Sequence, residues 1–162
     1  MIVYCKESEQ KVFLVAANII AAQILKKPES VLGVMNYSEE TKGIRRILMR
    51  WTEDGYVDFS QASLIDYEKS NSYLSDVDLL FVEVSKNSNF SRGYEVYQTC
   101  KEAETVLMVV KGKEQARMIK DIFESSVLSE NPMAILREHE CVMLVGDKEA
   151  LSRLSKTGIW YE

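Results

Sequence analysis

Short apolar runs alternate with longer stretches of mixed polarity along almost the whole chain. The apolar runs predict strands at residues 2–5, 30–35, 62–65, 77–84, 105–110, 140–146 and 159–161. The runs at 77–84 and 105–110 are almost uninterrupted, which is typical of strands that are buried on both faces of a sheet.

The stretches between these strands have the periodicity of amphipathic helices. Helices are predicted over residues 7–27, across 44–51, after Gly112 and, capped by Asp147, over 148–156. Strands that alternate with helices predict an α/β fold with a mostly parallel sheet and helices on both of its faces. No internal repeat and no linker rich in Gly, Pro or Ser interrupts the chain, so we expect a single domain over residues 1–162.

Composition excludes several classes of function. The 162 residues carry a formal net charge of −5, which disfavours the basic surfaces that nucleic acids and anionic membranes require. The sequence has no signal-peptide pattern and no apolar run long enough to span a bilayer, so we expect a cytoplasmic protein. The three cysteines are far apart, without a CxxC pair, and are expected to be reduced, strand-associated core thiols. His139 is the only histidine, which excludes a His-rich metal site, and no motif indicates a cofactor.

In open parallel sheets, ligands bind beyond the carboxyl ends of the strands, where the strand order changes direction. The loops expected at that edge are 35–41, 66–73, 83–92 and 111–115. The first loop, MNYSEET, has no glycine that would let backbone N–H groups approach an anion, and it contains Glu39 and Glu40. Those carboxylates would repel a phosphate, and Ser38 is better interpreted as part of a helix cap.

Other loop residues allow both a functional and a structural interpretation. Asp66 and Glu68 are candidates for a general base, but without a histidine partner they are better interpreted as solvated acids in a turn. Asn87, Ser88 and Asn89 are able to hydrogen-bond a sugar-like ligand or simply to build turns. None of these three side chains titrates near neutral pH, so they do not supply proton transfer.

Five segments of the chain, taken in order, resemble the motifs of one enzyme family. VLGVM resembles a VLGLP strand that precedes a TGGTP loop, and DGYVDFSQASLIDYE resembles the approach to a DEY motif. VDLLFVEVSKNSNF resembles the strand and loop that carry GxGxDGHIAFNEP, and EAETVLMVVKGKEQA resembles AEEVMILVLGxxKA. PMAILREHECVMLVGDKEAL resembles PASxLQxHPxAxxVxDExA, including Pro132, His139 and Asp147. The chain thus resembles the glucosamine-6-phosphate deaminase/isomerase and 6-phosphogluconolactonase family, most closely the deaminases, which implies a three-layer Rossmann-like fold.

The departures from the family pattern fall at the residues that perform its chemistry. MNYSEET stands where the family has its glycine-rich phosphate loop, and Glu83 and Ser85 replace glycines of the next motif. Asn87 stands in place of an aspartate and Asn89 in place of the catalytic histidine. The remaining histidine, His139, occupies a position for which the resemblance implies a structural role.

Three further positions differ from the family or align with it in two ways. Gln115 matches the phosphate-binding lysine, and Lys113, two residues earlier, is either an anion contact or an exposed lysine. The acid of the DEY motif matches Glu68 without a gap, or Asp66 with a small gap. The insertion that covers the family's active site is missing between about residues 90 and 94.

The sequence therefore predicts a non-catalytic relative of this family that binds a small, sugar-like ligand or a protein. The residues expected at the ligand site are Asn36, Tyr37, Ser38, Glu83, Ser85, Asn87, Ser88, Asn89 and Lys113. We expect no nucleic-acid or membrane partner, no cofactor or metal, and a homo-oligomer or a complex with a protein partner. The alternative is a sugar or amino-sugar isomerase or deaminase with an altered substrate, which uses Asp66 or Glu68 as its base. A third interpretation is a regulatory, effector-binding module, because related folds serve in sugar-responsive regulators.

Overall fold

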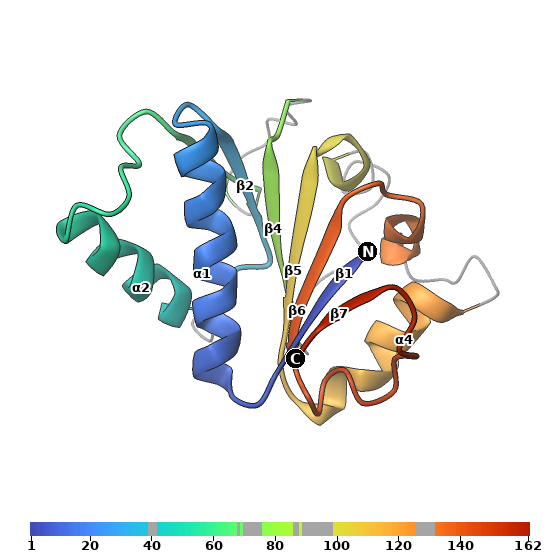
Figure 1. Ribbon diagram of the computed structural model, residues 1–162. Coiled ribbons are helices and arrows are strands. Elements are labelled where there is room, and N and C mark those ends of the chain that lie inside the picture. The colour runs from blue at the N-terminus through green and yellow to red at the C-terminus, as the bar shows by residue number, and fades with distance from the viewer. Residues whose placement is uncertain (39–41, 68, 70–75, 86–87, 89–98, 126–131) are drawn as a thin grey trace.

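The computed structural model describes residues 1–38, 42–67, 69, 76–85, 88, 99–125 and 132–162. The strands of these residues form one seven-stranded sheet, in which every pair of neighbouring strands is parallel (Figure 1). They are β1 (Ile2–Lys6), β2 (Val31–Met35), β3 (Ser63–Asp66), β4 (Leu79–Val84), β5 (Thr105–Val110), β6 (Val142–Asp147) and β7 (Ile159–Tyr161). Each lies within two residues of a predicted strand, so the α/β prediction with a mostly parallel sheet is confirmed.

β4 and β5 form the middle of the core because their sequences are apolar on both faces. Every residue of β4 is buried, as is every residue of β5 after the first. Alternate side chains of β4 enter two different hydrophobic clusters, with Leu80 and Val82 on one face and Leu79 and Phe81 on the other. By the same alternation, the Glu83 side chain lies on the face of Leu79 and Phe81.

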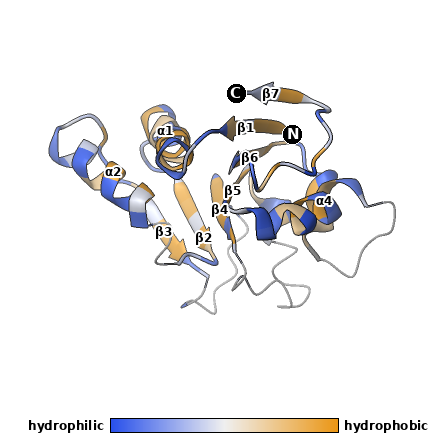
Figure 2. Ribbon diagram, turned by 90° about the horizontal axis from the view of Figure 1, so that it is seen from below, coloured by the Kyte–Doolittle hydropathy of each residue, from blue (hydrophilic) through white to orange (hydrophobic). Residues whose placement is uncertain are grey.

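Helices cover both faces of the sheet (Figure 2). α1 (Glu9–Lys26) and α2 (Lys42–Glu53) lie on one face, and α4 (Ala116–Glu124) lies on the other. α2 packs closely against α1, where a Cβ at Gly43 would overlap the ring of Phe13, so this contact requires glycine. Within the described residues, none of the helices combines the length and the apolar character that crossing a bilayer requires.

The segment after β6 differs from the prediction. The prediction of a helix over residues 148–156 is wrong, because the chain forms turns there. The Asp147 carboxylate does accept the Ala150 N–H at 2.7 Å, as expected of a cap. One helical bond then joins the Leu151 N–H to the Asp147 carbonyl, but the Leu154 N–H bonds only three residues back, to Leu151. Such tight bonds make 3-10 turns rather than an α-helix. Two 3-10 helices, η2 (Lys113–Gln115) and η3 (Pro132–Arg137), precede α4 and β6.

The strand order changes direction between β2 and β4. In space the order is β3-β2-β4-β5-β6-β1-β7, so the chain leaves β2 toward one side of the sheet and leaves β4 toward the other. β2 and β4 are direct neighbours, with Met35 paired to Val82 near their carboxyl ends. The crevice in which ligands of open parallel sheets bind is therefore expected at these two strand ends.

Candidate functional site

The side chain of Glu83 joins the carboxyl ends of β2 and β4. Its carboxylate accepts two hydrogen bonds from Ser38, one from the backbone N–H at 2.7 Å and one from the hydroxyl at 2.6 Å. Glu83 is only 2% exposed, so this contact lies inside the protein. Charge-assisted hydrogen bonds of this length offset part of the cost of burying a carboxylate. Ser38 lies four residues before α2 begins, and both of its donors are directed to the protein's own acid.

The two serines expected at the ligand site after β4 close a turn. The Ser88 hydroxyl accepts the Ser85 N–H at 2.8 Å and donates to the Glu83 carbonyl at 2.9 Å. The Ser88 N–H donates to the Ser85 carbonyl at 3.0 Å. These bonds give both serines a structural role at the end of β4, as the turn-building interpretation of Ser88 requires. Asn87 and Asn89, expected at the same site, lie outside the described residues.

Asn36 and Tyr37 follow β2 directly. Asn36 has a φ of 56°, in the left-handed region that Asn tolerates better than most residues. Its side-chain Nδ2 is buried and, among the described residues, has no hydrogen-bond partner. The Tyr37 ring meets the Phe81 ring edge-on, with the two centroids 6.3 Å apart, and Tyr37 remains partly exposed. The end of β2 therefore holds a buried amide donor without a partner among the described residues, and a partly exposed aromatic ring, beside the Ser38–Glu83 contact.

Asp66, one of the two candidate bases, ends β3 and forms an ion pair with Lys69 at 3.1 Å. Its side chain is 33% exposed. A carboxylate that acts as a base near neutral pH needs an environment that disfavours its charge, such as burial or a like charge. Asp66 instead has a cation neighbour and is partly solvated. Glu68, the other candidate, lies outside the described residues. Next in the chain, burial raises the pKa of the Tyr67 hydroxyl, and the Thr99 side chain partly offsets that effect.

The Asp147 side chain connects the loop after β5 to the turn after β6 by hydrogen bonds. Its carboxylate accepts the Gly112 N–H at 2.9 Å, at a glycine whose φ of 85° disfavours other residues. Lys113 follows in η2 and is exposed, whereas Gln115 is 2% exposed. The buried polar side chain here is therefore the uncharged amide that the resemblance matches to a phosphate-binding lysine.

His139 lies at the opposite edge of the sheet, beside the amino ends of β5 and β6. Its Nε2 is 2.8 Å from the Ala103 carbonyl oxygen, and its Nδ1 accepts the Cys141 N–H at 3.1 Å. Both ring nitrogens bond to backbone groups, which fits the structural role that the resemblance implies.

The cysteines are free thiols. Cys5 lies in β1 and Cys141 directly precedes β6, but Cys100 lies in a helical turn over residues 99–102. The prediction of strand-associated thiols is therefore wrong for Cys100. Burial raises the pKa of the Cys100 thiol to about 12, so it is a poor nucleophile at neutral pH. In the part of the chain that the structure describes, no group of His, Cys, Asp and Glu side chains is arranged to hold a metal ion.

Comparison with known proteins places these features in context. No protein-family model matches the chain. The chain is 37% identical over 54 residues to a glucosamine-6-phosphate deaminase from Lactococcus lactis subsp. cremoris, a match that covers 33% of this chain and 23% of that enzyme. It is 39% identical over 57 residues to the glucosamine-6-phosphate deaminase of Exiguobacterium sibiricum, which covers 35% of this chain and 23% of that enzyme. The matched segment thus spans less than a quarter of the length of these curated relatives.

Solved structures match the fold over nearly the whole chain. A monomeric glucosamine-6-phosphate deaminase aligns with a TM-score of 0.75 and 15% identity, over 94% of this chain and 100% of that chain. The 6-phosphogluconolactonase from Trypanosoma cruzi aligns with a TM-score of 0.68 and 10% identity, over 95% of this chain and 97% of that chain. The chain is therefore an α/β protein with a parallel, Rossmann-like sheet. Its fold is that of the glucosamine-6-phosphate deaminases and 6-phosphogluconolactonases, and the resemblance that the sequence motifs indicate is confirmed. The insertion predicted to be missing near residues 90–94 falls outside the described residues.

Proposed function

We propose that the chain is a non-catalytic relative of the glucosamine-6-phosphate deaminases and 6-phosphogluconolactonases that binds a small, uncharged, sugar-like ligand. The ligand would bind at the crevice between the carboxyl ends of β2 and β4. The observation that carries this proposal is the contact between Ser38 and the buried carboxylate of Glu83.

This contact makes a sugar phosphate a poor ligand for the crevice. A phosphate-binding turn presents backbone N–H groups to the anion, but the Ser38 N–H and hydroxyl already donate to Glu83. A phosphate at the same place would meet the Glu83 carboxylate. At a separation of ~4 Å and an intermediate dielectric, the repulsion is roughly 4 kcal/mol for each pair of unit charges. The family resemblance places a glycine at this position, so the protein's own acid fills space that a glycine would leave open.

The positions expected to transfer protons support the same proposal. Asn89 and Asn87 stand in the sequence where the family has its catalytic histidine and aspartate, and amides do not titrate near neutral pH. The remaining histidine, His139, bonds to the backbone through both ring nitrogens at the other edge of the sheet. Asp66, a base in the alternative isomerase or deaminase function, is paired with Lys69.

Two groups at the end of β2 favour an uncharged, hydroxyl-rich ligand. The buried Nδ2 of Asn36 has no partner among the described residues, and a sugar hydroxyl would satisfy this donor. The partly exposed ring of Tyr37 offers an apolar surface with a polar tip for the carbon face of a sugar ring. Few, well-placed polar groups beside an apolar surface are typical of small-molecule sites.

A thermal-shift screen at fixed ionic strength tests the proposal. The panel holds glucosamine, N-acetylglucosamine, gluconate, glucosamine 6-phosphate and inorganic phosphate, and a parallel assay measures deaminase and lactonase turnover. We expect an uncharged sugar to raise the melting temperature, no response to phosphate, and no turnover. A ligand at 100 times its Kd contributes about 2.7 kcal/mol, which corresponds to several degrees for a domain near this size.

Asn36→Gly removes the amide and keeps the left-handed backbone, so it should abolish the sugar response. Asn18→Ala removes an exposed amide from α1 and serves as the control. Turnover of glucosamine 6-phosphate, or a melting-temperature rise with it alone, would contradict the proposal. No response to any compound would instead favour a protein-binding role.

A further inference from the structure

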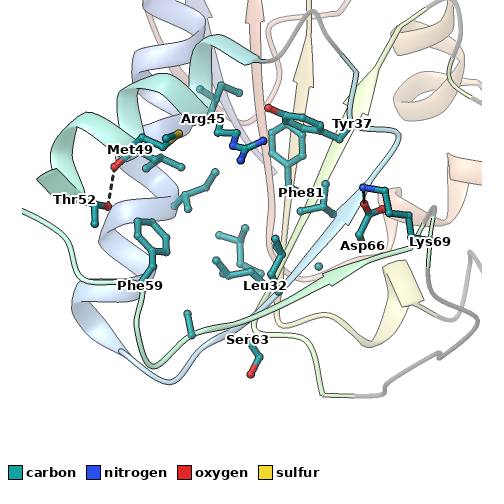
Figure 3. Close-up of a pocket in the computed structure, with 18 of the residues that line it drawn as sticks. Leu32, Tyr37, Arg45, Met49, Thr52, Phe59, Ser63, Asp66, Lys69 and Phe81 are labelled. Atoms are coloured by element: carbon teal, nitrogen blue, oxygen red, sulfur yellow. Dashed lines mark hydrogen bonds and ion pairs between the residues drawn. The ribbon is translucent and has the colours of Figure 1, made fainter.

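A second feature of the molecule is a cavity of about 700 Å³ between α2 and the β3–β2–β4 side of the sheet (Figure 3). Its volume is in the range of pockets that hold small organic ligands. Leu32 and Val34 of β2 and Leu79 and Phe81 of β4 form its floor, and Ile44 and Leu48 of α2 contribute to its wall. The lining is therefore mainly apolar and comes from rigid elements of the fold.

The cavity is open because α2 packs against α1 rather than against the outer strands. Ile44 is 3% exposed and joins the cluster of α1, but Met49, further along the same helix, is 52% exposed. Leu64 of β3 also lines the cavity and is 69% exposed. Large apolar side chains that face one solvent-accessible space mark a binding surface rather than a packed core.

One unpaired cation projects over this apolar floor. Figure 3 shows the Arg45 guanidinium directed from α2 toward the rings of Tyr37 and Phe81. No described residue forms an ion pair or a hydrogen bond with Arg45, which lies in the N-terminal half of α2, where the helix dipole also favours an anion.

The other charged groups of the lining do not neutralise Arg45. Asp66 is paired with Lys69 at 3.1 Å on the β3 side of the cavity. Glu53 lies eight residues after Arg45 on α2, which is about 12 Å along the helix axis. The hydroxyl of Thr52 donates to the Leu48 carbonyl at 2.9 Å. Among the described residues, no anionic group therefore pairs with Arg45 at its end of the cavity.

We infer that this cavity binds a small carboxylic acid with an aromatic or branched aliphatic body. The carboxylate pairs with Arg45, whose planar guanidinium offers two parallel N–H donors to a carboxylate. The body lies on the Leu32 and Phe81 floor beside the Tyr37 ring. A sugar would fit poorly here, because the lining would leave most of its hydroxyls without partners. The site shares the Tyr37 ring with the Ser38–Glu83 crevice, but it lies under α2 and does not rest on the function proposed for that crevice.

Isothermal titration with two matched probes tests the inference. 4-Phenylbutyrate carries the required anion, and 4-phenylbutanol has the same body without it. We expect the acid to bind at least about tenfold more tightly than the alcohol, because the hydrogen-bonded charge pair is lost with the alcohol. Arg45→Gln should weaken the acid by a similar factor, whereas Arg46→Gln, at an exposed position outside the lining, should not. Equal affinity for both probes, no binding of the acid, or equal effects of the two arginine variants would overturn the inference.

A second variant tests the location of the probe. Ala62 lines the cavity, so Ala62→Leu should fill part of it and abolish binding of the acid. Ala22→Leu, on the exposed side of α1, should bind like the unmodified protein. If Ala62→Leu does not fold, the comparison of Arg45→Gln with Arg46→Gln still decides whether the acid binds at Arg45. Sedimentation equilibrium tests whether a second copy of the chain occupies the cavity instead. If Arg45→Gln dissociates an oligomer and Arg46→Gln does not, a second copy lies in the cavity and the inference is overturned.

Discussion

Buried polar side chains lie at both the amino and the carboxyl edge of the sheet, but they have different roles. At the amino edge, the Asp78 carboxylate accepts the Val31 N–H at 2.7 Å and pairs with Lys27 at 2.6 Å, and its side chain is 5% exposed. His139 bonds to the backbone through both nitrogens at the same edge. At the carboxyl edge, Glu83 likewise accepts a backbone N–H, but that N–H belongs to the loop that would hold a ligand.

This difference shows that the role of a buried acid depends on its place in the strand topology and not on burial alone. The amino-edge contacts join segments that are far apart in the chain and hold the start of β2 and the approach to β6, so we assign them a role in the stability of the fold. The carboxyl-edge contact lies in the crevice that the strand order opens, beside the proposed ligand. His139, which matches the family pattern, lies at the first edge. Glu83 and Gln115, which depart from that pattern, lie at the second edge, together with Asp147, which matches it.

The largest effect should come from Asp78→Ala. The change leaves the partly buried Val31 N–H without its acceptor and removes a charge-assisted bond, so we expect the free energy of unfolding to fall by roughly 2–4 kcal/mol. Urea denaturation measures this loss, and the sugar response should remain. Asp54→Ala, which removes an exposed partner of Arg50, should change stability by less than about 1 kcal/mol. Equal losses for the two variants would remove the structural role assigned to the amino edge.

A smaller loss of stability, with a change in ligand preference, should follow Glu83→Gln. An amide still accepts one bond from Ser38 but forgoes the charge assistance, so we expect a loss of about 1–2 kcal/mol. The crevice also loses its negative charge, and the melting temperature should now rise with inorganic phosphate. Glu149→Gln makes the same change of net charge at an exposed site and should show neither effect. If phosphate changes the melting temperatures of Glu83→Gln and Glu149→Gln equally, Glu83 does not exclude anions from the crevice.

Much of the fold follows from the sequence, because strand and helix patterns are local. The runs that became β4 and β5 are apolar on both faces, and that property alone indicates central strands of a parallel sheet. The turn after Asp147 could not be predicted in the same way. Its apolar spacing suits a helix, and the short tight bonds that replace the helix leave no local signal.

The candidate site depends on contacts between residues far apart in the chain. Ser38 and Glu83 are separated by 45 residues, and Gly112 and Asp147 by 35, so only the register of the strands brings each pair together. The sequence indicates that Glu83 replaces a glycine, but not that its carboxylate takes up the donors of Ser38. Arg45 was not among the predicted site residues, because its role depends on the space that α2 leaves beside β2 and β3.

The smallest effect concerns Cys100, which lies just before the amino end of β5 and tests whether that edge is closed to solvent. Burial raises its pKa from 9.0 to about 12. Below pH 9 the thiol is protonated in the folded and the unfolded protein, so it contributes no pH dependence. Between pH 9 and about 12 the thiol ionises only in the unfolded chain, so stability falls as the pH rises. Urea unfolding at pH 8 and pH 10 should show a loss of about 1 kcal/mol that Cys100→Ala does not share.

Thiol labelling provides the companion measurement for Cys100. Cys5 is only partly buried and should react with an aromatic disulfide reagent in the folded protein, whereas Cys100 should react only after unfolding. The same pH dependence in Cys100→Ala and in the unmodified protein, together with rapid labelling of Cys100, would mean that the amino edge admits solvent. A closed amino edge requires both a protected thiol and a paired acid. If the thiol is accessible, the two edges of the sheet differ only in the roles of Asp78 and Glu83.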